Sequence, residues 1–367
     1  MIPRTKRLFC GGLLAALAIG GTLPGLAQDT AAVQAYLRAR GAYEEQAQTY
    51  WQSIADKRRA RFAKRRNGGA IGLDDYVLTQ PPVYSGPPRP PGYVPKQEPG
   101  PPPEHIPTLA EFLRAAAEQY NFVPNRPTET QFKHAYAKVA RTAGLTREQA
   151  VRVYAFETGG NGTYDGQSGI VGNKNRNARP ISPAMGYNQL LSTNTVSLLA
   201  EHGDRFVATL KASGVGEAKI AVLKKMIAFS RTVPNAWSEH DKLAKTTQGG
   251  IGIHAAVLDR DFGPLLQMQK LLDSVEFARA KGTKRPLTGA ELELMNFTGD
   301  GNGFDLVTMP QELREKVPTS NFFQRGGYER NPIARRTGTV AALVASIETK
   351  MDQASQAQGA RELAQAF

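Results

Sequence analysis

The sequence predicts a mainly α-helical protein. Thr108–Glu111, Thr128–Gln131 and Thr146–Gln149 each place a threonine three residues before Glu or Gln, the spacing of a capping box that opens a helix. No long stretch alternates apolar and polar residues, as strands require. The 367 residues are 41% apolar, enough for a buried core. Their mean hydropathy of −0.39 excludes a polytopic membrane protein.

Residues 1–27 have the pattern of a cleaved export signal. Three basic residues precede an uncharged run from Leu8 to Leu23, and Leu26-Ala27 follows with a small residue at the end. The alternative is a membrane anchor, but four glycines interrupt the apolar run. The only cysteine, Cys10, lies in this segment, so the mature chain has no thiol for a disulfide, a zinc site or a nucleophile. We therefore expect a periplasmic or secreted protein.

A helical, basic N-terminal segment is expected over residues 28–80, with the helix at 30–66. Seven of the ten residues from Lys57 to Arg66 are Lys or Arg, and the whole chain carries a net charge of +13. Two interpretations stay open: a solvated helix end, or an electrostatic tether to an anionic envelope surface. No nucleic-acid partner is expected, because exported proteins rarely meet one.

A proline-rich linker is predicted over residues 81–107, which hold 12 of the 24 prolines. Such a tract adopts extended polyproline II rather than helix or sheet. At ~3.1 Å per residue it would form a semi-rigid spacer of about 80 Å. We take it as the domain boundary.

A second helical domain is expected over residues 108–356, followed by a tail at 357–367. The third capping box opens a helical pattern over 147–158. Further helical patterns cover 193–213, 216–230, 253–278, 288–297 and 338–356. Asp300–Asp305 has some features of a calcium loop, but it lacks the sixth-position glycine and the fifth-position ligand. A polar turn is expected there.

Several kinds of site are excluded by their missing motifs. The sequence has no His-Glu-x-x-His, no Gly-x-Ser-x-Gly elbow, no Walker A loop and no Gly-x-Gly-x-x-Gly. We expect neither a metal nor a cofactor.

Glu157 is the strongest candidate for chemistry. In helix 147–158 it follows Ala150, Val153 and Tyr154 at the spacing that puts all four on one apolar face. Burial would raise the pKa of this carboxyl, and the helix dipole disfavours a negative charge in the last turn. Both effects favour a general acid. The alternatives are a glutamate that reaches water and one paired with Arg152.

Two later segments strengthen this interpretation, Ser182–Leu191 and Leu294–Gly299. With Glu157 they resemble the soluble lytic transglycosylase family of lysozyme-like proteins, over roughly residues 140–330. Glu157-Thr158 is similar to the family's Glu-Ser pair, Ala184-Met185-Gly186 with Gln189 to its small-Met-Gly-Leu-Met-Gln segment, and Asn296 to its Ala-Tyr-Asn. The chain departs from the family at Tyr187-Asn188, which replace Leu-Met, and at Met295, which replaces Tyr.

The resemblance implies a lysozyme-like catalytic domain acting on peptidoglycan glycan strands. It would cleave the β-1,4 bond between N-acetylmuramic acid and N-acetylglucosamine and leave 1,6-anhydro ends. Glu157 would be catalytic. The implied substrate-binding residues are Thr158, Gly186, Tyr187, Asn188, Gln189, Asn296 and Tyr328.

Two alternatives remain open. A goose-type muramidase would use water as the nucleophile and a second carboxylate, for which the candidates are Asp165, Asp204, Asp300 and Asp305. A catalytically silent wall-binding protein would keep the fold without the reaction.

Overall fold

The computed structural model describes residues 25–94, 105–170 and 178–367, with side chains from residue 31 onward. The expected export signal therefore lies almost entirely outside the described residues. The prediction of a mainly α-helical protein is confirmed: the described residues form sixteen α-helices and, apart from isolated bridges, no strands. None of these helices is both long enough and apolar enough to cross a membrane.

The α-helices are α1 (Gly25–Arg66), α2 (Leu109–Tyr120), α3 (Glu129–Thr142), α4 (Arg147–Thr158), α5 (Ser192–Ala212), α6 (Glu217–Ser230), α7 (Trp237–Thr246), α8 (Gln248–Ile253), α9 (Phe262–Ala280), α10 (Gly289–Thr298), α11 (Asp300–Val307), α12 (Gln311–Arg314), α13 (Arg325–Arg330), α14 (Pro332–Thr337), α15 (Val340–Ser355) and α16 (Gln358–Ala366). All three predicted capping boxes form, at the starts of α2, α3 and α4. A fourth opens α10, where the Thr288 hydroxyl accepts the Glu291 N–H.

The chain divides into two compact units, and α1 contributes residues to both. In the first unit, the N-terminal part of α1 packs against the proline-rich tract. The ring of Tyr36 lies edge-on to those of Tyr84 and Tyr93, with centroids 6.2 and 5.8 Å away. The described part of the tract in this unit therefore packs against α1, and the expectation of a semi-rigid spacer is wrong there.

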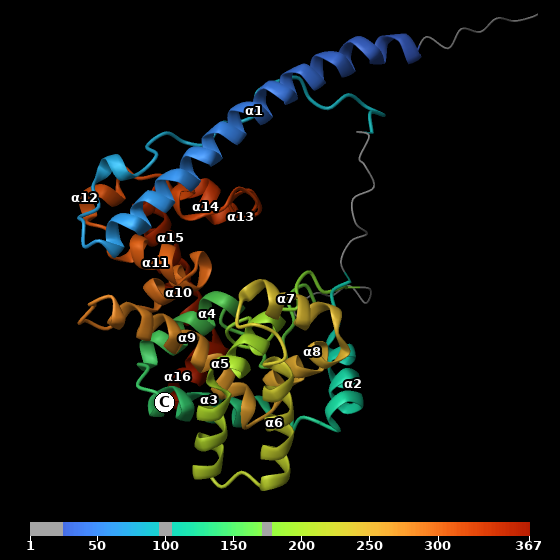
Figure 1. Ribbon diagram of the computed structural model, residues 1–367, viewed down its shortest axis with the longest axis vertical. Helices are drawn as coiled ribbons and strands as arrows, with labels where there is room; N and C mark the ends of the chain where they lie inside the picture. Colours follow the sequence, from blue (N-terminus) through green and yellow to red (C-terminus); the bar gives the residue numbers. More distant parts are fainter. Residues whose placement is uncertain (1–24, 95–104, 171–177) are drawn as a thin grey trace, which may run out of the picture. The chain divides into compact units, whose positions relative to one another are not determined.

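The second unit contains residues 51–81 and the chain beyond the proline tract, with two buried clusters. One cluster joins α3, α4, α9, α10, α15 and α16, and the other joins α2 and α5 to α8. In Figure 1, α5 and α6 run side by side as an antiparallel pair.

Three predictions of local structure are wrong. The helix expected over 253–278 is broken, because the Asp259 carboxylate accepts the N–H groups of Asp261 and Phe262 and forms a turn before α9. Asp300–Val307 is helix α11 rather than a polar turn. The expected tail is largely helix α16, whose Ala360 and Leu363 are completely buried.

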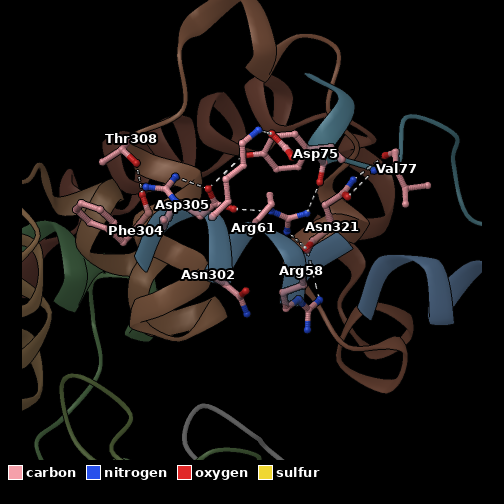
Figure 2. A network of polar contacts seen from close by, with 12 residues as sticks. Arg58, Arg61, Asp75, Val77, Asn302, Phe304, Asp305, Thr308 and Asn321 are labelled. Atoms are coloured by element: carbon pink, nitrogen blue, oxygen red, sulfur yellow. Dashed lines mark hydrogen bonds and ion pairs between the residues drawn. The ribbon is translucent and has the colours of Figure 1, made fainter. Parts of the chain in front are cut away.

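One residue in the basic end of α1, Arg61, is part of the second unit's interior, which neither the solvated helix end nor the tether predicts. Arg61 is completely buried, and its Nε donates to Asp305 Oδ2 at 2.9 Å. Its Nη1 and Nη2 donate to the carbonyls of Asp75 and Asn321 at 3.0 and 3.2 Å. Figure 2 shows how these groups surround the guanidinium.

Neighbouring basic residues also form ion pairs and hydrogen bonds within the second unit. Arg65 pairs with Asp305, and Arg58 donates to the Phe323 carbonyl at 2.6 Å. Lys64 forms an ion pair with Asp75 at 2.7 Å. Part of the positive charge therefore fastens α1 to the chain around Asp305 and Asn321, while Arg59, Lys64 and Arg66 are exposed.

Candidate functional site

Helix α4 presents Glu157 at its C-terminal end. Ala150, Val153 and Tyr154 are completely buried, as the apolar stripe predicts, and Gly159 ends the helix with a φ of +65°. Glu157 continues the same face but is only partly buried. The core therefore fixes the carboxyl of Glu157 at the end of α4, where that helix packs against α10.

The proposed pairing of Glu157 with Arg152 is not observed. Arg152 forms ion pairs with Glu348 and Asp352, and a third with Glu148 one turn earlier on its own helix. Among the described residues, no cation forms an ion pair with Glu157. Its charge is therefore not neutralised by a salt bridge.

The sequence analysis missed Glu293, on α10. Its side chain is 1% exposed, between the completely buried Leu292 and Leu294. The carboxyl groups of Glu157 and Glu293 lie within hydrogen-bond reach of each other. Helix α10 is apolar on several faces, which is typical of a buried helix. Glu291 belongs to its capping box, so the glutamate at the centre, Glu293, was the feature of the sequence that could have indicated a buried carboxyl.

Asn296 lies beside this pair, as the resemblance implied. One turn after Glu293 on the same face of α10, its Nδ2 donates to Glu157 Oε1 at 3.3 Å. It also forms a hydrogen bond with Glu293. Since Asn296 is partly exposed, Glu157 and Asn296 form the accessible edge of the site and Glu293 its interior.

Burial controls the protonation of the two glutamates. It raises the pKa of Glu157 to about 7, against the opposing hydrogen bonds from Glu293 and Asn296. It also raises the pKa of Glu293 well above its ordinary value, and the adjacent charge of Glu157 acts in the same direction. The two glutamates therefore titrate as a pair, and both carboxyls hold their protons to higher pH than a free glutamate does.

A short hairpin from Met185 to Leu190 supports α4. Met185 bridges both Leu190 and Gln167. Gly186 has a φ of +84°, and a Cβ there would lie 2.9 Å from the Gln267 amide, so only glycine fits. This requirement is structural, because the close neighbour is a side chain of the protein itself.

Tyr187 and Asn188 are corrections to the predicted substrate contacts. Tyr187 is completely buried, donates to Glu129, and packs its ring 4.7 Å from that of Tyr154 on α4. Asn188 is buried and accepts from the Tyr136 hydroxyl at 2.6 Å. Both side chains hold the hairpin against the helices and do not face a glycan in this structure.

The remaining predicted contacts also have structural partners. Gln189 has a φ of +43°, and its Nε2 donates to the carbonyls of Gly166 and Gly186. The Thr158 hydroxyl donates to the Tyr154 carbonyl one turn back, at 2.6 Å. Tyr328 is buried against Trp51 and Phe323. Of the seven, Asn296 is the one whose side chain forms a hydrogen bond with Glu157 in the described part of the chain.

In the described structure, each of the four aspartates considered as a second carboxylate forms its hydrogen bonds or ion pairs with residues other than Glu157. Their partners are Arg126 for Asp165, Arg231 for Asp204, Ser274 for Asp300, and Arg61 with Arg65 for Asp305. The second carboxyl of the site is Glu293. A separate depression of about 700 Å³, lined by residues such as Phe122, Val215 and Lys219, includes none of the site residues.

Comparison with known proteins identifies no relative: no family model, curated protein or solved structure matches the chain.

Proposed function

We propose that the protein is a peptidoglycan lytic transglycosylase in which Glu157 is both general acid and general base. The observation that carries the proposal is the carboxyl of Glu157, which lies beside Asn296 at the end of α4 and whose pKa is raised to about 7 by burial. An acid–base catalyst works best when its pKa is near the operating pH, because both protonation states are then populated.

The reaction needs a proton to leave Glu157 and then return. Protonated Glu157 would donate to the glycosidic oxygen as the bond from the muramyl anomeric carbon to that oxygen breaks. The resulting carboxylate would accept the proton of the C6 hydroxyl of the same muramyl residue. The C6 oxygen then bonds to the anomeric carbon and closes the 1,6-anhydro ring.

The neighbours of Glu157 suit these two steps. Desolvation favours the protonated carboxyl before bond cleavage. The hydrogen bonds from Glu293 and Asn296 favour the carboxylate once the proton has gone. Glu293 and Asn296 are therefore positioning residues in this mechanism.

The closeness of the two carboxyl groups favours transglycosylation over hydrolysis. Hydrolases that use two carboxylates hold them about 5–5.5 Å apart when retaining, and about 6.5–9.5 Å apart when inverting. Glu157 and Glu293 lie within hydrogen-bond reach of each other, which differs from the separated carboxyls of both kinds of hydrolase. An intramolecular nucleophile such as the C6 hydroxyl needs no second carboxylate.

Digestion of purified sacculi tests the proposal. We expect the wild type to release 1,6-anhydro-muropeptides, detected by mass spectrometry. Glu157→Gln keeps the size of the side chain but removes the titratable proton, so the rate should fall by ~10²–10⁴-fold or more. Glu118→Gln, on the exposed face of α2, is the matched control and should retain the wild-type rate.

Two results would contradict the proposal. A folded Glu157→Gln variant that works at the wild-type rate would exclude Glu157 as the catalyst. Reducing-end muramic acid in place of anhydro ends would identify a goose-type hydrolase acting at the same site.

A further inference from the structure

A cluster of metal-ligating side chains lies apart from the Glu157 site, between α5 and α9. Glu201 and His202 are adjacent on α5, and Asp273 is on α9. One potential ligand atom from each lies within 4.8 Å of the others. His202 Nε2 is 3.0 Å from Asp273 Oδ1 and 3.7 Å from Glu201 Oε2.

These separations match those of donors around one small cation. Zinc binds nitrogen and oxygen at about 2.0–2.2 Å, which in a tetrahedral site puts neighbouring donors about 3.3–3.6 Å apart. The His202–Asp273 separation of 3.0 Å lies just below this range, and the His202–Glu201 separation of 3.7 Å lies just above it. Two carboxylates this close also repel each other unless a positive charge lies between them.

The hydrogen bonding of His202 argues against a simple ion pair. Its Nε2 is buried and makes no hydrogen bond, although a carboxylate oxygen of Asp273 is only 3.0 Å away. The nitrogen and the oxygen are close but not aligned for N–H···O, as expected of two atoms that point to a shared third atom. Gln269 holds the same Asp273 oxygen with a hydrogen bond of 2.7 Å, and Phe206 packs beside the imidazole ring.

A second histidine supplies an independent observation. His240, on α7, is completely buried, and neither of its ring nitrogens has a hydrogen-bond partner. Burial lowers the pKa of His240, and the charge of Glu201 opposes this effect. An unpartnered neutral imidazole in the interior is costly unless a ligand pairs with it.

The geometry points to a binding site for a divalent transition-metal ion of the zinc type, held by Glu201, His202 and Asp273. The mixed nitrogen and oxygen donors favour zinc over calcium or magnesium, which prefer oxygen ligands only. Three protein ligands leave a coordination position open. The ion ties α5 to α9, so its role is to brace the second unit, independently of the reaction at Glu157.

Titration with zinc tests the site. The untagged full chain is treated with EDTA, dialysed, and titrated with ZnCl₂ in a calorimeter. We expect one zinc per chain, with affinity at least tenfold weaker in His202→Ala and in Asp273→Asn. His134→Ala removes an exposed histidine from α3 and is the matched control, with unchanged affinity.

The unfolding temperature gives a second readout. Zinc should raise it in the wild type, in His134→Ala and in the catalytically inactive Glu157→Gln, but not in the two ligand variants. Retention of the wild-type affinity by either folded ligand variant would overturn the assignment. Equal binding of calcium and zinc would overturn the choice of metal. If His202→Ala does not fold, Asp273→Asn alone decides.

Discussion

At the scale of single residues, the central feature is a pair of carboxyls that differ only in their surroundings. Glu293 is enclosed by the core, whereas Glu157 is only partly buried. In the proposed mechanism the same chemical group therefore positions its neighbour in one place and transfers a proton in the other.

The raised pKa values predict how stability depends on pH. Between the ordinary carboxyl pKa of 4.5 and about 7, Glu157 binds its proton more tightly in the folded chain than in the unfolded chain. The contribution of Glu157 to the free energy of unfolding should therefore be fully present below about pH 4.5 and be lost as pH rises through 7. Glu293 contributes in the same direction, because burial and the charge of Glu157 raise its pKa as well.

Urea unfolding at pH 5 and pH 8 checks this prediction. The double variant Glu157→Gln with Glu293→Gln should lose about 1–3 kcal/mol less than the wild type over this range, since both titrating groups are gone. Glu118→Gln should follow the wild type. Identical losses in the wild type and the double variant would show that neither glutamate has a raised pKa.

At the scale of elements, the C-terminal half of α1 is fastened by one buried charge cluster. The Arg61 guanidinium also lies over the Tyr76 ring, 4.4 Å from its centroid, and the Tyr76 hydroxyl donates to Asp305. This cluster joins α1, the segment that follows it, and α11. Removing one partner leaves a buried charge incompletely paired.

Arg61→Met should lower the free energy of unfolding by about 3–5 kcal/mol, because Asp305 stays buried with only Arg65 as its cation. Arg59→Met is the control, since Arg59 is exposed and pairs only with Asp56 one turn away. The control should change stability by no more than about 0.5 kcal/mol. Thermal or urea unfolding measures both. Equal stability of the two variants would refute a structural role for Arg61.

At the scale of the whole molecule, the second unit is not continuous in sequence. Residues 51–81 belong to it although the proline-rich tract separates them from the rest. Asn321 illustrates the connection: its side chain exchanges two hydrogen bonds with the backbone of Val77, at 3.0 and 2.8 Å. The domain that the capping boxes place at Thr108 is therefore incomplete.

Truncation tests this division. A fragment of residues 51–367 should unfold cooperatively, whereas a fragment of residues 108–367 should have a clearly lower urea midpoint. The shorter fragment lacks Tyr76 and the neighbouring residues that pack on the core, and it removes both arginines that pair with Asp305. Equal midpoints would mean that residues 51–81 add nothing to the unit.

The sequence by itself determined the features that depend on local physics. Helix starts were predicted because a capping box is formed by residues three apart, and Glu157 was found because its position on an apolar face follows from helical spacing. The sequence did not identify Glu293 as the partner of Glu157, since 136 residues separate them and only packing of α10 on α4 brings the carboxyls together. It left Lys57–Arg66 as either a solvated helix end or a tether for the same reason, because the buried anion that pairs with Arg61 lies 244 residues later. Local patterns predict elements, whereas the burial and pairing of charges are decided by contacts between distant segments, and only the tertiary structure contains them.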